Sequence, residues 1–266
     1  MRISSRKLGL IGLLLLLAQP SWAAISLVQT ATPNTVSATT DPVTFSSSSS
    51  SGDLIVASWG DNSNSFTVSF GISGATCSGG AFTLCPASQL QDSSGNATSQ
   101  IAWCLLSSSG TVTVTSTLGG SEVQAMNLTE WAGIKNPSPA DVCSTGATAG
   151  GVAANPTIPS TGTLTTTNAS DLVIGNAFQN IASAGMTGLT SGFTQSTVAT
   201  SGGATLQTVY QITSATGNYG ASWTSSLSSV WAGTLATFKA ATTFSGTQIG
   251  EQDAGTRLAD LGFALE

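Results

Sequence analysis

Hydrophobic and polar residues alternate along much of this chain, and one stretch of the alternation occurs twice. Ile101–Trp131 aligns without a gap onto Thr208–Phe238, so that Trp103 matches Tyr210. Each copy contains three alternating runs, rich in β-branched residues and separated by Ser, Thr and Gly. Short runs with a period of about two, bounded by turn residues, predict β-strands. The repeat therefore predicts a duplicated all-β architecture.

The last two strands of each copy are expected to pair as a hairpin with one apolar face. In the first copy the expected neighbours are Val112–Leu128, Val114–Met126 and Ser116–Gln124. In the second copy they are Tyr219–Leu235, Ala221–Gly233 and Trp223–Trp231. Small polar residues such as Thr111, Thr113 and Thr115 fall on the opposite face, where they suit water. Two half-buried hairpins of this kind favour a β-sandwich.

Residues 24–240 are expected to form a jelly-roll-like β-sandwich built from two similar halves. The connection between the halves, Ala132–Ala140, is short, which favours one intertwined sandwich. Two immunoglobulin-like sandwiches of about 100 residues each are the alternative. Residues 241–266 contain more charged side chains and are expected to form a C-terminal tail.

The N-terminus has the pattern of a signal peptide over residues 1–23. Arg2, Arg6 and Lys7 precede the apolar run Leu8–Ala18, and small residues suitable for cleavage follow at Ser21–Ala23. The run is shorter than the roughly 20 apolar residues that span a bilayer. We expect cleavage after Ala23, no membrane-spanning segment afterwards, and a secreted or cell-surface location.

The charge balance excludes one class of partner. Loss of the signal peptide would leave Lys135, Lys239 and Arg257 as the only Lys or Arg residues, against 12 Asp and Glu. Nucleic-acid binding needs a basic patch that neutralises phosphates, and none is present in this sequence. Extracellular polysaccharide or other surface proteins are the expected partners.

Four cysteines, Cys77, Cys85, Cys104 and Cys143, follow the signal peptide. An even number in an exported chain predicts two disulfides. Zinc is disfavoured because the chain has no histidine and no C-x2-C pair. Cys77 and Cys85 lie in an insertion specific to the first copy, and Cys104 matches polar Gln211 and is expected to face outward. The predicted pairs are therefore Cys77–Cys85 and Cys104–Cys143.

Three segments suggest a family. Gly52–Ala57, Val123–Gly133 and Trp231–Lys239 resemble the strand motifs of a class of secreted bacterial jelly-roll-like β-sandwich domains without an assigned activity. The resemblance extends over residues 25–240. It implies the fold and export, and it implies no activity.

Candidate catalytic residues are limited by the absence of histidine, which excludes Ser-His-Asp and Cys-His catalysis. Paired carboxylates remain. Glu122 and Glu130 would lie about 26 Å apart on one strand, too far for one sugar ring, although either has a potential partner in Asp61 or Asp92. We interpret them as solvated carboxylates. Asp53 and Asp171 recur in both copies as turn residues would, so no catalytic residue is assigned.

Two low-specificity binding sites remain. Asp61, Asn62 and Asn64 place oxygen ligands in one loop that would suit a structural calcium ion, the one cofactor considered, although such clusters are usually turns. Trp223 and Trp231 occur where the first copy has polar residues, and paired indoles stack well on sugar rings. The alternative, which we prefer, is that both cap the core.

The sequence thus favours a non-catalytic secreted protein, a cell-surface or matrix interaction or adhesion module. A carbohydrate-binding module of a polysaccharide-degrading system is the alternative, and a histidine-free glycosidase or lyase comes third. A fold alone does not distinguish these functions.

Overall fold

The computed structural model describes residues 21–22, 24–31, 33–63, 67–92, 94, 96–143, 147–149, 161–181, 186–201, 203–227 and 229–243. These residues form strands, bridges and turns and contain no helix. Among the described residues, no helix has the length and apolarity needed to cross a membrane. The predicted all-β sandwich is confirmed.

The first sheet has seven strands, which are β2 (Ser26–Thr30), β3 (Asn34–Thr44), β4 (Leu54–Asp61), β5 (Ser69–Ser73), β6 (Thr83–Gln91), β7 (Thr98–Leu105) and β8 (Thr113–Ala132). Their order is β2-β8-β4-β7-β6, and β3 and β5 also pair with β8. All of these pairs are antiparallel. The central strand β4 is buried over its whole length.

The second sheet has six strands, which are β9 (Ala140–Cys143), β10 (Ala147–Ala149), β12 (Asp171–Gln179), β14 (Thr194–Ser201), β15 (Ala204–Ile212) and β18 (Trp231–Lys239). Their order is β10-β18-β12-β15-β14, and β9 also pairs with β18. Two short pairs complete this half, β11 (Leu164–Thr165) with β16 (Asn218–Tyr219), and β13 (Met186–Thr187) with β17 (Thr224–Ser225).

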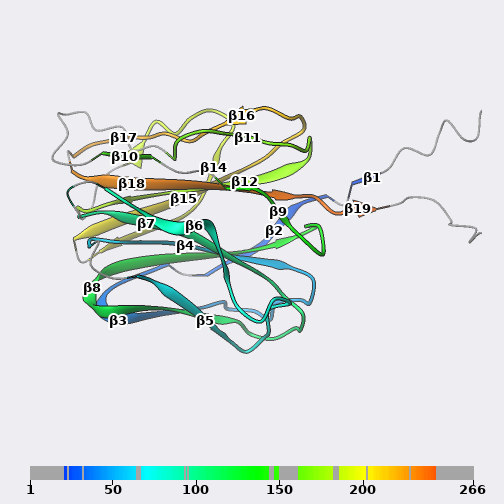
Figure 1. The fold of residues 1–266 in the computed structure, drawn as a ribbon, viewed down its shortest axis with the longest axis horizontal. Coiled ribbons are helices and arrows are strands. Elements are labelled where there is room, and N and C mark those ends of the chain that lie inside the picture. The colour runs from blue at the N-terminus through cyan, green and yellow to red at the C-terminus, as the bar shows by residue number, and fades with distance from the viewer. Residues whose placement is uncertain are drawn as a thin grey trace, which may run out of the picture. The chain divides into compact units, whose positions relative to one another are not determined.

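The two sheets pack face to face, and each repeat copy contributes two strands to one of them (Figure 1). The first copy contributes β7 and β8 on either side of β4, and the second contributes β15 and β18 on either side of β12. Strand β8 faces β15, whereas β18 faces β7. The facing pairs β8–β15 and β18–β7 are equivalent to each other. A two-fold axis between the sheets therefore relates the two halves, as it relates the subunits of a symmetric dimer.

The layer between the sheets is apolar at both ends and polar in the middle. The Asn176 side chain donates to the backbone oxygens of Trp59 (3.1 Å) and Gln100 (3.3 Å). Nearby, Asn127 Nδ2 donates to Thr208 Oγ1 at 2.9 Å. Buried polar groups that are paired in this way fix the register of the sheets, because a shift would leave them without partners.

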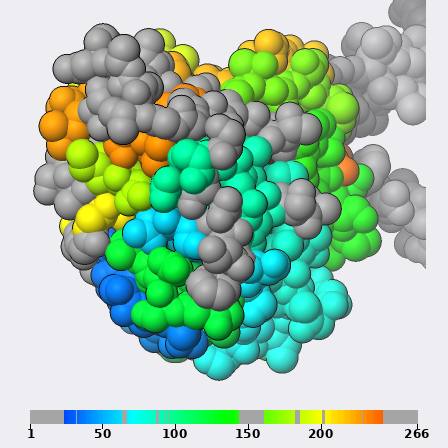
Figure 2. Space-filling model, turned by 60° about the vertical axis from the view of Figure 1, so that its left-hand side comes forward, coloured from blue at the N-terminus to red at the C-terminus, as the bar shows by residue number. Residues whose placement is uncertain are grey.

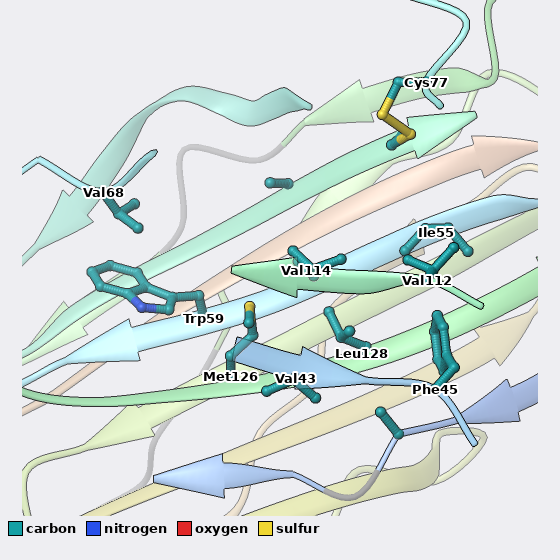
Figure 3. Packing of buried hydrophobic residues seen from close by; sticks show 14 of the residues in the cluster. Val43, Phe45, Ile55, Trp59, Val68, Cys77, Val112, Val114, Met126 and Leu128 are labelled. Carbon is teal, nitrogen blue, oxygen red and sulfur yellow. A yellow bond between two sulfur atoms is a disulfide. The ribbon is translucent and has the colours of Figure 1, made fainter. Parts of the chain in front are cut away.

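Strand β8 contradicts the hairpin predicted for the first copy. It runs continuously over 20 residues, and its first half lies with β3 and β5 in an outer layer that covers the first sheet. Val114 and Met126 do share one core cluster, as Figure 3 shows, but they face each other from different layers. Ser116 Oγ donates to Gln124 Oε1 at 2.7 Å, so this predicted pair meets through side chains and not through a strand ladder.

The hairpin predicted for the second copy is also absent. Residues 218–225 pair with β11 and β13 instead of β18, and they form the outer layer of the second sheet. Trp223 packs in that layer with Met186 and Val209. Trp231 belongs to β18, where its backbone neighbours are Gln179 and Ala149. The register that made the two tryptophans cross-strand neighbours is therefore wrong.

The predicted disulfide pairing is wrong as well. The bonds are Cys77–Cys104 and Cys85–Cys143, with Cα–Cα distances of 5.5 and 5.3 Å. The error follows from the expectation that Cys104 faces outward. Both faces of the first sheet are covered, and Cys104 is 1% exposed beneath the outer layer, where it meets Cys77. Cys85 lies on the other face, among residues packed between the sheets.

The chain divides into two compact units, Ala23–Ala241 and a second unit formed by Met1–Trp22 with Thr242–Glu266. In the second unit β1 (Ser21–Trp22) pairs with β19 (Thr242–Thr243). Most of the predicted signal peptide and of the 241–266 tail lie outside the described residues, so cleavage after Ala23 stays a prediction. The two disulfides indicate an oxidising compartment.

Candidate functional site

The loop predicted to bind calcium uses its oxygens differently. Asn62 Oδ1 accepts a hydrogen bond from the Val123 backbone nitrogen at 3.1 Å, and Asn64 lies outside the described residues. Asp61 is fully buried, and burial is the main cause that raises its pKa to about 7, so less of it is ionised at neutral pH than of an exposed aspartate. In the described part of the chain, no cluster of three or more His, Cys, Asp or Glu could hold a metal ion.

The predicted sugar platform of Trp223 and Trp231 is not formed. The two side chains are only 1% and 7% exposed. Stacking on a sugar needs an open ring face. Both residues instead fill the core, which agrees with the alternative that they are capping residues.

The recurring aspartates each meet a second carboxyl group. The pKa of Asp53 is raised to about 6, mostly by burial and in addition by hydrogen bonding to Glu130 and by its negative charge. Glu130 is fully buried and accepts hydrogen bonds from Ser49 Oγ (2.9 Å), the Ser50 nitrogen (3.2 Å) and Gln29 Nε2 (2.5 Å). Asp53 therefore lies beside a buried carboxyl group, Glu130, that is held in a hydrogen-bonded network.

The second half repeats this arrangement with a partner from a different position. The pKa of Asp171 is raised to about 8, mostly by burial and in addition by hydrogen bonding to Asp141 and by its charge, while Lys239 partly opposes the shift. Burial pushes the pKa of Asp141 upward too, but hydrogen bonds from Thr167, with smaller contributions from Asp171 and Lys239, hold it below its ordinary value. The proton of this pair therefore belongs to Asp171.

The remaining acids considered as catalytic candidates are dispersed. Asp92 accepts hydrogen bonds from the Asn96 (2.8 Å) and Ala97 (2.6 Å) nitrogens and caps a turn. Glu122 acts on Asp61 only as a neighbouring charge that raises its pKa slightly. The structure thus brings Glu130 to Asp53 and Glu122 towards Asp61. The interpretation of these acids as solvated is wrong for Glu130 and Asp61, which are fully buried.

A pocket of about 180 Å³ opens beside β7 and is not predicted by the sequence. One wall is the loop that follows Cys77, including Ser78 and Ala81; another is Pro137–Pro139; and the third is Trp103 with its β7 neighbours. None of the lining residues is charged. We call this site the Trp103 pocket.

Backbone hydrogen bonds and disulfides hold the walls of the Trp103 pocket in place. The Ser78 nitrogen donates to the Leu105 oxygen at 2.8 Å, next to the Cys77–Cys104 bond. The Lys239 nitrogen donates to the Pro139 oxygen at 2.7 Å. The pocket is therefore largely preformed, as small-molecule sites usually are.

A second candidate surface covers the outer side of β3, β8 and β5. Alternation along the strands turns Val43, Val114 and Ile72 inward, towards the core cluster. The outward residues form rows across the strands: Thr44, Thr113 and Ser73; Pro42, Thr115 and Gly71; Thr40, Thr117 and Ser69. We call this set the hydroxyl face. All its residues are exposed except Thr113 and Thr115, which are half-buried.

The hydroxyl face is regular and uncharged. Its strands lie about 4.8 Å apart, and successive outward residues repeat about every 6.7 Å along each strand. Thr44 and Thr113 share a hydrogen bond between their hydroxyl groups at 2.8 Å. In Figure 2 the segments coloured blue (β3) and green (β8) lie side by side at the surface. The alternation over Thr111–Thr115 predicted that this face of β8 is exposed to solvent. That β3 and β5 extend it on both sides could be seen only in the structure.

Comparison with known proteins adds no assignment. The chain matches no protein-family model, and no curated protein or solved structure shows significant similarity to it. The structure itself defines the class of protein, which is a disulfide-bonded β-sandwich with an internal duplication.

Proposed function

We propose that this chain is a non-catalytic, exported adhesion module that attaches to extracellular polysaccharide through the hydroxyl face. The single observation that carries the proposal is the uncharged array of Thr and Ser across β3, β8 and β5. Export itself rests on the N-terminal pattern and the two disulfides.

The chemistry of the hydroxyl face favours a polysaccharide over a protein partner. Protein interfaces depend on buried Trp, Tyr and Arg anchors, and the hydroxyl face has none. A polysaccharide surface presents hydroxyl groups at repeating intervals, which Thr and Ser can meet as donors and as acceptors. Each such hydrogen bond contributes only about 1 kcal/mol net, but many formed together give strong attachment.

The carboxyl pairs argue for binding without hydrolysis. Glycosidases that use two carboxyl groups hold them about 5–9.5 Å apart on either side of the scissile bond. Asp53 instead lies close enough to Glu130, and Asp171 to Asp141, for the neighbouring carboxyl group to raise the pKa of the aspartate. Neither pair lines the Trp103 pocket.

The test is adsorption of the folded mature chain to insoluble polysaccharides such as cellulose and chitin. Thr117→Lys combined with Ser69→Lys places two charges on exposed positions of adjacent strands. We expect adsorption to fall about tenfold or more, because ammonium groups facing an uncharged surface must be desolvated. The matched control, Thr163→Lys with Thr165→Lys, changes exposed positions on the other outer layer and should adsorb like the unaltered chain.

Equal adsorption by both lysine variants would show that the hydroxyl face is not the contact surface. Adsorption to no polysaccharide, with capture by a cell-surface protein instead, would overturn the choice of partner.

A further inference from the structure

We propose that the Trp103 pocket is a separate binding site for one uncharged sugar ring. This goes beyond the proposed adhesion, since the pocket uses different residues from the hydroxyl face. The two proposals can therefore be tested independently. The inference begins from the composition of the pocket walls, which combine an aromatic ring, prolines and small hydroxyl residues.

The size of the Trp103 pocket limits its ligand. Its volume of about 180 Å³ is smaller than the pockets that enclose drug-sized molecules, which start at about 300 Å³. A single six-membered sugar ring fits this limit, and a disaccharide would have to extend outside. The pocket therefore suits the end of a chain or a free monosaccharide.

The Trp103 ring supplies the surface on which a sugar would rest. It is half-buried, and its edge-to-face contact with Phe238, with centroids 6.2 Å apart and planes at 75°, fixes its orientation. The C–H face of a sugar is apolar and packs well on an aromatic ring. Pro137 and Pro139 add further rigid apolar surface.

The polar groups of the pocket match hydroxyl groups and not charges. Ser78, Thr83 and Ser138 contribute hydroxyl-bearing side chains to the lining. With no cation in the lining, a sugar acid would gain nothing from its charge.

The experiment follows the indole N–H signals of ¹⁵N-labelled mature chain by NMR during titration with methyl glucoside, methyl mannoside and N-acetylglucosamine. Trp103→Phe identifies the Trp103 signal by its disappearance. We expect this signal to shift and saturate for at least one sugar, with a dissociation constant of about 1–10 mM for so small a ligand. The signals of fully buried Trp59 and Trp131 should not move.

A pocket-filling variant separates binding from folding. Ala81→Leu adds volume from an exposed loop position that lines the pocket and should abolish the shift. Ala215→Leu makes the same change at an exposed position elsewhere and should leave the titration unchanged. The proposal is overturned if the Trp103 signal does not move at saturating sugar, or if Ala81→Leu binds as well as Ala215→Leu.

This outcome is independent of the adhesion test. Ala81→Leu should adsorb to insoluble polysaccharide like the unaltered chain, since the hydroxyl face is unchanged. A chain that adsorbs but shows no Trp103 shift loses the pocket site alone, whereas one that shifts without adsorbing loses the adhesion proposal alone.

Discussion

The two outer layers of this sandwich each contain an equivalent stretch of the repeat, yet they differ in their strands. In the first half β8 continues without interruption, and β3 and β5 pair with it on both sides. In the second half the equivalent stretch is divided into β16 and β17, which pair with two-residue strands. Duplication therefore fixes the two facing sheets and leaves the outer layers free to diverge.

The inward residues explain how each layer is held. In the first half Ser116 and Gln124 form a buried hydrogen-bonded group with Trp59, whose Nε1 donates to Gln124 Oε1 at 3.0 Å. In the second half the same repeat positions carry Trp223 and Trp231, which fill space where no long strands cover the sheet. A continuous outer layer produces a flat, patterned surface, and a layer of short pieces does not.

The largest effect on stability is expected when a buried residue of the second outer layer is replaced by its counterpart from the first. Trp223→Ser introduces the residue of the first copy into a site that is 1% exposed. The loss of packing should lower the free energy of unfolding by about 3–5 kcal/mol, measured by chemical denaturation. An equal loss from Thr224→Ser, at the exposed neighbouring residue, would show that Trp223 does not hold the layer.

The disulfides come next, because they act differently on the two halves. Cys85–Cys143 joins the halves across a sequence separation of 58, whereas Cys77–Cys104 closes 27 residues within the first half. In the chain-entropy model, replacing both cysteines of a pair by Ala should cost about 4 and about 3.5 kcal/mol respectively. Non-reducing peptide mapping checks the pairing, and a Cys77–Cys85 peptide would contradict the structure.

The all-β class and the sandwich follow from alternation and from the repeat, whereas the errors have one physical cause. A period of two shows which residues share a face, and it correctly groups Val114 with Met126. It does not show whether the opposite face is also covered. Because both faces of the first sheet are covered, Cys104 and the predicted hairpins were misplaced.

The candidate sites were harder to predict for a related reason. Asp53 and Asp171 recur at equivalent positions, but their partners Glu130 and Asp141 come from different elements and leave no repeated pattern. In the sequence Trp103 stood out only as the match of Tyr210, and nothing placed Pro137–Pro139 against it.

The buried carboxyl groups give a pH dependence that both halves share. The pKa values of Asp41 and Asp53 are raised to about 6, that of Asp61 to about 7 and that of Asp171 to about 8, from an ordinary 3.8. Burial is the largest cause for each. Between pH 3.8 and about 8 the folded chain therefore binds more protons than the unfolded chain, so stability falls as the pH rises through this window.

The thermal midpoint should therefore be higher near pH 4.5 than near pH 8, measured by circular dichroism. Below pH 3.8 the trend reverses, because the lowered pKa values of Asp92 and Asp141 contribute stability that is lost on protonation. Asp171→Asn should flatten the upper part of the profile. A midpoint that rises steadily from pH 4.5 to pH 8 would contradict these assignments.

The smallest change in stability is expected on the hydroxyl face itself. Thr113→Val, Thr115→Val and Thr117→Val together remove hydroxyl groups from β8 and keep the shape of the side chains. Each should alter the free energy of unfolding by about 0.5 kcal/mol or less, because surface substitutions usually do. Adsorption to polysaccharide should nevertheless weaken several-fold, and unchanged adsorption would separate the hydroxyl groups from binding.

The central claim is that the outer layer of the first half, and not that of the second, contacts polysaccharide. Carbene footprinting of the chain free and adsorbed to its best polysaccharide tests this directly. We expect labelling to decrease over residues 40–44, 69–73 and 113–117 and to stay constant over residues 163–165 of the opposite layer. Protection of residues 163–165 with no change in the other three segments would contradict the account.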